Sequence, residues 1–425
     1  MAQGPDDRNA ATDGLLRLET AHAQLRDWLS ARAPIAGSTE CPLAACRGRF
    51  LATDLVARRD VPPHDNAAVD GYAVHFADLA PDGPTTLPVA GRAAAGHPFG
   101  DTPPPRTAIR IFTGAPLPPG LDTVFAEETC HATGGTVTLP APPGAPGANC
   151  RARGEDVRKG EILLTQGRRL RPQEIGLAAG NGLSALPVYR RLRAAIFSTG
   201  DEVTAPGGDL RPGAIYDSNR PMLHALLESN GLEVSDLGIV ADEQSALGNA
   251  IDRALEDHDV ILSSGGMSTG EEDHVRRAVA ERGRILFWRL AIRPGRPVAF
   301  GEIRDGDRMV PFIGLPGNPV AAMVTFLHLA APVLARLGGG QPEPPLRIPV
   351  RADFAYRKKP GRREWLRVHV GPDRSGAPGA RLYPESGSGI LSSLVFANGL
   401  VELAEESAGV EPGEMVDFLP FPETG

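Results

Sequence analysis

The sequence predicts a multi-domain chain of α/β plus β class, with a central α/β domain and β-rich second and C-terminal domains. Its 425 residues allow about three domains of ordinary size. Between residues 191 and 344, short apolar runs alternate with helical stretches, which is typical of βαβ units around a mainly parallel sheet. Residues 57–160 and 345–425 instead combine many Pro and Gly residues with short strand-like runs, which predicts two β domains.

The first part of the chain predicts one helix and then short strands. Residues 1–12 are polar, and we expect them to be disordered. Apolar residues recur at steps of three and four from residue 15 to residue 29, and Pro34 ends this helix. Strands are expected at residues 89–90, 108–112, 124–127 and 136–139.

The α/β domain is predicted to begin with a strand at residues 194–197. Asn219 is a good helix cap and Pro221 suits a first helical turn, so a helix is expected there, ending at Gly231. The expected order then runs strand 232–240, helix 243–257, strand 260–262, helix 273–282, strands 285–290, 298–301 and 309–313, and helix 320–337.

Composition excludes several classes of protein. The 44 Lys and Arg residues against 52 Asp and Glu give a formal net charge of −8, which disfavours a general nucleic-acid or anionic-membrane binder, so any anion site must be a local cluster. The 4 Cys residues show no zinc or disulfide spacing and suggest a reducing compartment. No signal peptide is visible, and the most apolar window, 321–337, is interrupted and too short for a membrane span. We therefore expect a soluble, cytoplasmic protein.

Three polar or Gly-rich loops follow apolar strands of the α/β region, at residues 198–202, 263–270 and 314–319. Because open parallel sheets bind ligands beyond the carboxyl ends of their strands, these loops should meet at one crevice. Two of them lead into helices, whose free N–H groups suit a phosphate. None is a Walker A or dinucleotide-binding loop. The alternative for each loop alone is a tight turn without a ligand.

Acidic and basic residues add two further candidate sites. Glu202, Asp242 and Asp273 lie near strand ends or in helix first turns, where they either hold Mg²⁺ and a polar ligand or merely complement helix dipoles. Arg293 and Arg296 are held by prolines and a glycine, which makes a clamp for an oxyanion plausible, although surface arginines often serve solubility alone. The loop at 65–72 reads equally well as a turn or as part of a site.

Taken together, these stretches resemble the molybdopterin molybdenumtransferases of the MoeA type, a family that includes the E domain of gephyrin. The resemblance runs in order from about residue 13 to the C-terminus. Each motif alone is weak, but their common order is specific. The matching segments are residues 65–73, 111–116, 153–156, 197–202, 215–220, 264–273, 293–297, 314–320, 360–364, 387–389 and 392–393.

The resemblance implies a fold and an assembly. It predicts an elongated, four-domain protomer with a doubly wound, molybdopterin-binding α/β domain like that of molybdopterin adenylyltransferases. The implied domains are a helix at 13–35 that packs on the α/β domain, a linker and dimerisation domain at 36–56 and 161–190, a β-rich domain at 57–160, the α/β domain at 191–344 and a C-terminal β domain at 345–425. The implied partners are a second copy in a homodimer and, transiently, molybdopterin adenylyltransferase and apo-molybdoenzymes, with no nucleic acid and no membrane.

The resemblance also implies a reaction and its residues. The family uses Mg²⁺ to cleave adenylylated molybdopterin, inserts molybdate, and releases AMP and molybdenum cofactor. The implied catalytic residues are Asp70, Thr113, Asp156, Glu202, Asp242 and Asp273, of which Glu202, Asp242 and Asp273 are the candidates for metal contacts. Molybdopterin and the nucleotide are assigned to Gly200, Gly265, Gly266, Ser268, Pro316 and Pro319. Molybdate is assigned to Arg293, Arg296, Arg362 and Ser388. Asp70, Thr113 and Asp156 would complete the site of the partner protomer.

This chain departs from the family in its cations. Arginine replaces the usual lysine at positions 289, 293 and 296, in a chain with only three lysines. Arginine offers a planar fork of donors where lysine offers a point charge. Whether molybdate or tungstate is preferred stays open.

Two other functions remain as alternatives. A molybdopterin adenylyltransferase would use the same α/β module, but it would not need the two β domains. A scaffold, as gephyrin became, would be a different class, but gephyrin's long connector has no counterpart here. Stabilisation by molybdate and Mg²⁺ would discriminate the enzyme from the scaffold.

Overall fold

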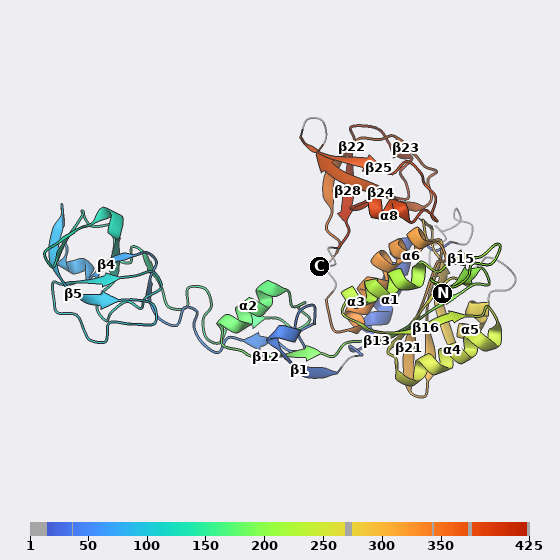
Figure 1. Ribbon diagram of the computed structural model, residues 1–425, viewed down its shortest axis with the longest axis horizontal. Coiled ribbons are helices and arrows are strands. Elements are labelled where there is room, and N and C mark those ends of the chain that lie inside the picture. Colours follow the sequence, from blue (N-terminus) through green and yellow to red (C-terminus); the bar gives the residue numbers. More distant parts are fainter. Residues whose placement is uncertain (1–14, 36, 268–273, 342–343, 373–375, 423–425) are drawn as a thin grey trace, which may run out of the picture. The chain divides into compact units, whose positions relative to one another are not determined.

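The computed structural model describes residues 15–35, 37–267, 274–341, 344–372 and 376–422 (Figure 1). The expected disorder of residues 1–12 lies outside the described residues. The chain divides into two compact units. The first comprises residues 1–39, 48–52 and 188–425, and the second comprises residues 40–47 and 53–187.

The first unit contains a six-stranded sheet in the order β16-β13-β17-β21-β20-β18. The first four strands are parallel, whereas β20 is antiparallel to β21 and β18 is antiparallel to β20. The strands are β13 (Arg193–Thr199), β16 (Glu233–Val240), β17 (Val260–Ser264), β18 (Gly283–Arg289), β20 (Pro297–Asp305) and β21 (Arg308–Leu315). The strand–helix alternation therefore predicted the parallel part correctly, and the sheet ends in an antiparallel extension.

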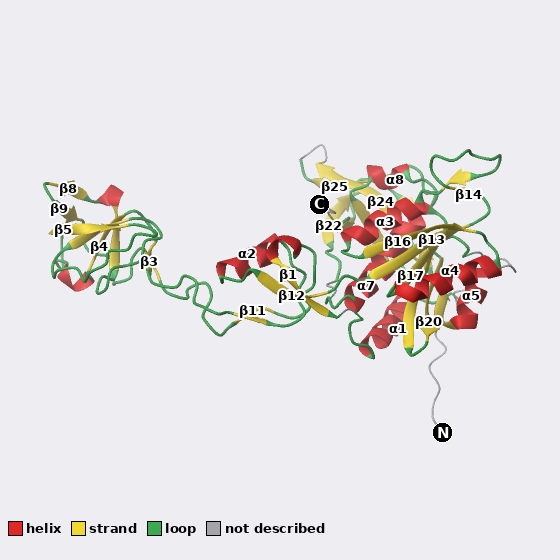
Figure 2. Ribbon diagram, turned by 60° about the horizontal axis from the view of Figure 1, so that its bottom comes forward, coloured by secondary structure: helices red, strands yellow, loops and turns green. Residues whose placement is uncertain are grey.

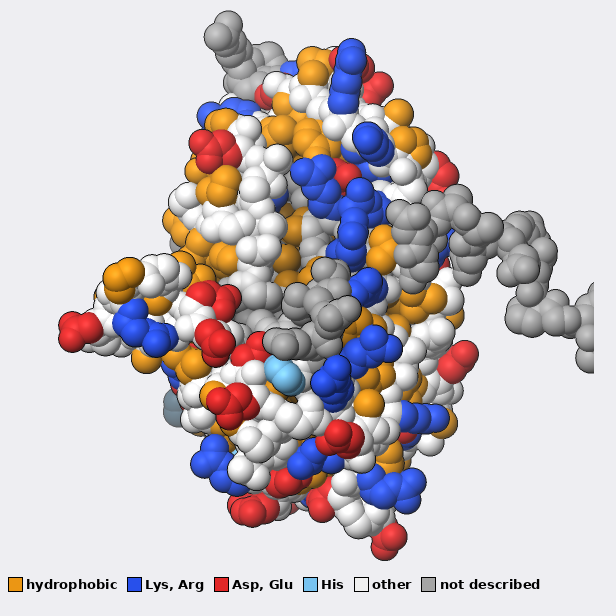
Figure 3. Space-filling model, turned by 90° about the vertical axis from the view of Figure 1, so that its right-hand side faces the viewer, with side chains coloured by type: hydrophobic (Ala, Val, Ile, Leu, Met, Phe, Trp, Pro, Cys, Tyr) orange, Lys and Arg blue, Asp and Glu red, His pale blue; other side chains and the backbone are white. Residues whose placement is uncertain are grey.

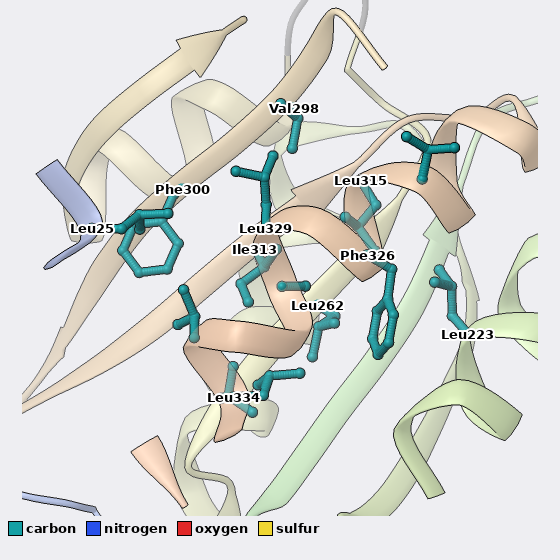
Figure 4. Close-up of a cluster of buried hydrophobic side chains, with 14 of the residues drawn as sticks. Leu25, Leu223, Leu262, Val298, Phe300, Ile313, Leu315, Phe326, Leu329 and Leu334 are labelled. Carbon is teal, nitrogen blue, oxygen red and sulfur yellow. The ribbon is translucent and has the colours of Figure 1, made fainter. Parts of the chain in front are cut away.

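Helices cover both faces of this sheet (Figure 2). Alternate residues of β13 explain why: Ala194 and Ile196 pack with α1, α3, α6 and α7, while Ala195 and Phe197 pack with α4 and α5. Figure 4 shows buried side chains on the face that carries α1, α3, α6 and α7, where they meet between the strands and the helices. The helices are α1 (Leu18–Ser30), α3 (Asn219–Ser229), α4 (Gln244–Asp257), α5 (His274–Arg282), α6 (Pro319–Thr325) and α7 (Ala331–Leu337). The domain is doubly wound, as predicted.

The helix expected at residues 320–337 is interrupted. Residues Phe326–Ala330 form a π-helical turn between α6 and α7. Pro332 explains the interruption, because it has no N–H to donate to the carbonyl of His328 and its ring would clash with it. That carbonyl lies 3.1 Å from Nε2 of His22 on α1. By length and composition, Pro319–Leu337 is the one helix of the described residues that could cross a membrane, but its packing makes it a core helix.

Helix α1 is attached to the sheet by a buried carboxylate. Leu18, Ala21, Leu25 and Trp28 form its buried face. Glu302 on β20 is 2% exposed and accepts hydrogen bonds at 2.7 Å from both the Trp28 indole and the Arg32 guanidinium, and at 2.5 Å from Arg284. These bonds satisfy the buried charge and fix α1 against the α/β domain.

The C-terminal domain, also in the first unit, is a closed barrel. Its sheet has the order β19-β24-β25-β22-β28-β26, and β24 also pairs with β26. The strands are β19 (Ile292–Arg293), β22 (Ile348–Ala352), β24 (Arg363–Pro372), β25 (Pro378–Leu382), β26 (Gly399–Leu403) and β28 (Met415–Pro420), with a short pair formed by β23 (Tyr356–Arg357) and β27 (Gly409–Val410). A short helix, α8 (Ser392–Phe396), precedes β26. Strand β19 comes from the turn that follows β18 of the α/β domain.

The second unit holds a six-stranded sheet in the order β7-β4-β6-β5-β9-β8. Its strands are β4 (Gly71–Val74), β5 (Thr85–Ala93), β6 (Ala108–Ile111), β7 (Thr123–Ala126), β8 (His131–Thr133) and β9 (Thr136–Leu139). Smaller pairs join β3 (Asn66–Ala67) to β10 (Cys150–Arg151), β2 (Leu55–Val56) to β11 (Ile162–Leu164), and β1 (Ser38–Pro42) to β12 (Ala185–Tyr189); α2 spans Pro172–Gly180. The predicted β character of residues 57–160 is thus confirmed.

Replacing Glu302 tests the attachment of α1. Because Glu302→Gln removes the charge that three donors share, we expect a loss of about 2 kcal/mol in the free energy of unfolding. Urea unfolding of the full chain measures it. The matched control is Asp305→Asn at the exposed end of the same strand, where the pair with Arg308 contributes about 0.5 kcal/mol at most. Equal losses in the two variants would contradict this role of Glu302.

Candidate active site

The three predicted loops meet at the carboxyl ends of β13, β17 and β21. The Gly265 N–H donates to the Leu315 carbonyl at 3.2 Å, and the Ser264 hydroxyl donates to the Pro316 carbonyl at 3.4 Å. A Cβ added to Gly317 would lie 3.6 Å from the Cα of Gly265. A Cβ added to Gly265 would also lie 2.2 Å from the Thr199 carbonyl oxygen of the first loop. The three loops therefore meet at one edge of the α/β sheet, as the order of strands and helices predicted, and we call this meeting point the crevice.

Asn219 ties these loops together and is not the helix cap that the sequence suggested. It is the first residue of α3, and Ser218 precedes it as the cap position. Its amide donates to the Ser264 hydroxyl at 2.9 Å and to the Gly317 carbonyl at 2.7 Å. Asn219 is not used as a cap because its buried amide, which lies between two loops, makes more hydrogen bonds there than it would at its own helix end.

Two glycines allow the chain segments to approach at this crevice. Gly265 has a φ of +84°, and a Cβ there would lie 2.2 Å from the Thr199 carbonyl oxygen. A Cβ at Gly266 would collide with the side chains of Thr199 and Val275, at 2.5 and 2.6 Å. The glycines assigned to molybdopterin are thus needed for the shape of the crevice, whatever they bind.

Several buried polar atoms at the crevice have no hydrogen-bond partner among the described residues. They are the hydroxyl oxygens of Ser198, Thr199 and Ser263 and the side-chain oxygen of Asn219. All four residues are at most 6% exposed. Since buried polar groups are normally paired, these atoms at the strand ends indicate a place for a polar ligand or water.

The predicted carboxylates are only partly described. Glu202 follows β13 and lies against Gly200, where an added Cβ would be 2.7 Å from its Oε2 atom. Asp242 lies half-buried in the loop between β16 and α4. Asp273 and Ser268 lie outside the described residues. Within the described ranges, no group of three or more His, Cys, Asp or Glu side chains is arranged to hold a metal ion.

A second cavity, of ≈ 690 Å³, lies beside the crevice and is open to solvent. The α/β domain contributes residues 292–297 and the loop before α6, and the C-terminal domain contributes β24 and residues 382–388. The charged side chains that line it are Arg293, Arg296, Arg362, Arg367, Glu364 and Glu385. Four guanidinium groups and two carboxylates give these lining residues a formal charge of +2, which suits a dianion. Figure 3 shows basic side chains gathered in a band on one face of this unit.

Arg367 is the most deeply buried cation of this cavity, and the sequence analysis missed it. It is 5% exposed on β24, where its guanidinium donates to the Ser393 hydroxyl at 3.0 Å and to the carbonyls of Glu385 and Gly387 at 2.8 and 3.3 Å. Burial lowers its pKa, yet a guanidinium stays charged at neutral pH. Among the described residues no carboxylate pairs with it. The sequence does contain one sign of this site. Arg367 interrupts the apolar run 365–368, and a charged residue in a buried strand needs a partner or a ligand.

The other predicted oxyanion residues line the same cavity. The guanidinium groups of Arg296 and Arg362 make no hydrogen bond or ion pair with any described residue. Ser388 lines the cavity too, and its carbonyl accepts the Val320 N–H, in the first turn of α6, at 3.1 Å. Pro319 is the first residue of that helix. The structure therefore brings Arg293, Arg296, Arg362 and Ser388 together.

Arg293 is positioned by a strand pairing between the two domains of this unit. Strand β19 pairs in parallel with β24, and this register sets Arg293 opposite Glu364. The Arg293 guanidinium lies 3.7 Å from the Glu364 carboxylate and 3.4 Å from the Tyr356 hydroxyl. The turn that follows is tight: Gly295 has a φ of +106°, and a Cβ there would lie 2.4 Å from the Thr325 side chain.

In the second unit, Asp70 and Thr113 form a hydrogen-bonded pair. One Asp70 oxygen accepts from both the Thr113 hydroxyl, at 2.6 Å, and the Thr113 N–H, at 2.8 Å. These bonds lower the pKa of Asp70, and both residues are exposed. Asp156 is exposed in the turn after β10, and its carboxylate makes no hydrogen bond or ion pair with the described residues.

Comparison with known proteins identifies the family. The family models that match are the MoeA N-terminal region (domains I and II) at residues 16–182, a probable molybdopterin binding domain at 195–336 and the MoeA C-terminal region (domain IV) at 349–421.

Known proteins match over most of the chain. The molybdopterin molybdenumtransferase of Haemophilus influenzae is 36% identical over 410 residues, which is 96% of this chain and 99% of that protein. The Nostoc enzyme of the same name is 35% identical over 392 residues, or 89% of this chain and 88% of that protein. The molybdopterin biosynthesis MoeA protein of Pyrococcus horikoshii superposes with a TM-score of 0.81 at 28% identity, covering 96% of this chain and 100% of that one. The chain therefore belongs to the MoeA family of molybdopterin molybdenumtransferases.

Proposed function

We propose that this chain is a cytoplasmic transferase of molybdenum cofactor biosynthesis that inserts molybdenum, taken from molybdate, into adenylylated molybdopterin and releases AMP. The observation that carries the proposal is the cavity lined by four arginines beside a phosphate-type crevice. A buried guanidinium such as Arg367, with no carboxylate partner among the described residues, is stabilised when a dianion enters.

The crevice and the cavity share a segment of chain, which supports the proposal that they bind two different reactants side by side. Pro316 and Gly317 line the cavity, while their carbonyls accept hydrogen bonds from Ser264 and Asn219 at the crevice. In this proposal the crevice binds the pterin and its phosphates, and the cavity binds molybdate. A molecule held in the crevice then presents one end to the oxyanion, and the two reactants need no further movement to meet.

The cofactor of the proposed reaction is Mg²⁺. Carboxylate oxygens are the protein ligands that Mg²⁺ prefers. Glu202 follows β13 and Asp242 follows β16, so both lie at the carboxyl ends of the parallel strands, where the crevice is. With Asp273, which lies outside the described residues, they would hold the ion. When bound, Mg²⁺ would neutralise charge on the phosphoanhydride. The chain's own contribution is to orient the phosphates through the N–H groups of the loops and to hold the oxyanion through the arginines.

We further propose a homodimer in which Asp70, Thr113 and Asp156 of one protomer complete the site of the other. Two observations support it. Asp70 and Thr113 are exposed, and their mutual hydrogen bonds hold the Asp70 carboxylate in place at the surface. Val56 and Ile162, which are paired across β2 and β11, are 52% and 59% exposed, as expected for an interface with another chain. The proposed transient partners are molybdopterin adenylyltransferase and apo-molybdoenzymes.

The release of AMP tests the proposed reaction. Purified protein given adenylylated molybdopterin and Mg²⁺ is expected to release AMP in a molybdate-dependent manner, and the product should activate an apo-molybdoenzyme. Chelation of Mg²⁺ should stop the release. AMP release at the same rate with and without molybdate would contradict the assignment of the cavity to molybdate. Formation of adenylylated molybdopterin from molybdopterin and ATP would instead favour an adenylyltransferase.

Arg367→Met tests the oxyanion cavity. The loss of a buried, charge-assisted donor is expected to lower molybdate-dependent turnover about 100-fold. Because the methionine keeps much of the side-chain volume, the thermal unfolding midpoint should fall far less than for a core deletion. Arg381→Met, at an exposed position of the same barrel, is the matched control and should keep full activity. Wild-type turnover in Arg367→Met protein would exclude this residue from the site.

Mixing two inactive variants tests the sharing of sites. In a homodimer whose sites combine residues of both protomers, mixing Asp70→Ala with Arg367→Met subunits should restore about a quarter of wild-type activity, since half of the dimers are mixed and each has one intact site. Turnover after exchange of subunits measures this. Each variant alone should stay inactive. If both residues instead serve the site of their own protomer, every site of a mixed dimer carries one mutation. Mixing would then restore no activity, which would contradict the shared site.

A further inference from the structure

The cavity that should receive a dianion contains a buried carboxylate. Glu364 on β24 is 4% exposed, and it lines the cavity together with the four arginines. The Tyr356 hydroxyl donates to its Oε2 atom at 2.8 Å, and the Arg293 guanidinium lies 3.7 Å from the same atom. The Tyr356 hydroxyl and the Arg293 guanidinium thus both face the same oxygen of Glu364, which occupies Arg293 before any oxyanion enters.

An oxyanion in the cavity would be attracted by the four arginines but repelled by an ionised Glu364. A dianion in the cavity would face a negative charge that is removed from solvent, and it would compete with that charge for Arg293. Arg293 belongs to a two-residue strand paired with β24, so its backbone cannot move away without breaking the pairing. The conflict is removed if the carboxylate becomes a neutral carboxyl group, which is both uncharged and a hydrogen-bond donor.

We propose that Glu364 takes up one proton from solvent when the oxyanion enters the cavity, and that its carboxyl group then donates a hydrogen bond to an oxygen of the anion. The proton forms an O–H bond on the carboxylate, and no other bond is made or broken. The same event releases the Arg293 guanidinium from Glu364 and leaves it free to face the anion. This inference rests on the proposed function, because it takes a molybdate-like dianion as the substrate of the cavity.

The other charged groups around Glu364 are poor proton acceptors. Tyr356 on β23 is already protonated, and burial together with the Glu364 hydrogen bond raises its pKa further. Lys358, which follows β23, donates to the carbonyls of Ala404, Glu405 and Ser407, and burial lowers its pKa. As an ammonium group it has no free electron pair to take up a further proton. Arg293 on β19, Arg362 beside β24, Arg367 on β24 and Arg296 across the cavity are cations. No histidine is among the described residues that line it.

Glu385 is the remaining carboxylate of the cavity and provides the matched control. It is exposed, so water screens its charge from a bound anion. Glu364 and Glu385 thus face the same cavity and differ in burial and in hydrogen bonding.

Calorimetric titration of the full-length protein with sodium molybdate tests the proposal. Titrations between pH 7 and 9, in buffers of different ionisation enthalpy, give the number of protons taken up per molybdate bound. The wild-type protein should take up close to one proton, and its affinity should fall up to about tenfold per pH unit. Glu364→Gln should bind molybdate more tightly, with no proton uptake and a flat pH profile. Glu385→Gln should keep the proton uptake of the wild-type protein.

The outcomes separate this inference from the proposed function. Molybdate binding without proton uptake, or proton uptake that persists in Glu364→Gln or disappears in Glu385→Gln, would overturn the role of Glu364, while molybdate-dependent AMP release would still stand. If the wild-type protein binds no molybdate, both the inference and the assignment of the cavity are wrong. Should Glu364→Gln fail to fold, Tyr356→Phe serves in its place. It removes a donor that stabilises the carboxylate, so molybdate should bind several-fold more tightly, and equal or weaker binding would overturn the proposal.

Discussion

The parallel pairing of β19 with β24 is the constraint on which the candidate site depends. It joins a two-residue segment of the α/β domain to the C-terminal barrel, at Ile292 opposite Arg363 and Arg293 opposite Glu364. The Arg363 N–H also donates to the Ala291 carbonyl at 3.0 Å. Because backbone hydrogen bonds fix this register, arginines from two separately folded domains face one cavity. Without this pairing, Arg293 and Arg296 would no longer be held beside Arg362 and Arg367, and the proposed oxyanion site would be lost.

The crevice depends on a different constraint, the close approach of loops that follow three parallel strands. Gly265 makes that approach possible and the Asn219 amide holds it, since one side chain bonds to the ends of two loops. Crevice and cavity are then linked through Pro316 and Gly317, which belong to both. In the proposed function, this shared segment would keep the pterin and the oxyanion at a fixed separation. The buried hydroxyls of Ser198 and Ser263, which have no hydrogen-bond partner in the described part of the chain, make this crevice polar.

Local patterns in the sequence predict the elements, and they predict the site only where one loop carries it. Alternating apolar runs and helical stretches predicted the doubly wound sheet, and the loops after its strands predicted the crevice. Arg293, Arg296 and Ser388 were identifiable from short motifs. Arg367 and Glu364 were not, because both lie in an apolar strand whose neighbours come from distant parts of the chain. The sequence suggests a cap at Asn219 because a helix begins there, but it does not show that the loops of two other strands meet at this side chain. The π-helical turn at Phe326–Ala330 depends on Pro332 and on acceptance of the His22 bond by the freed carbonyl, a contact across 306 residues.

The central claim is that the arginine-lined cavity holds the oxyanion. Crystals soaked in molybdate and measured on both sides of the molybdenum absorption edge would locate the metal directly by anomalous scattering. The account predicts one molybdenum peak inside the cavity, within hydrogen-bonding reach of Arg367 and Ser388 through the oxygens of the anion. A peak at the α/β crevice alone, or on unrelated surface arginines, would contradict it.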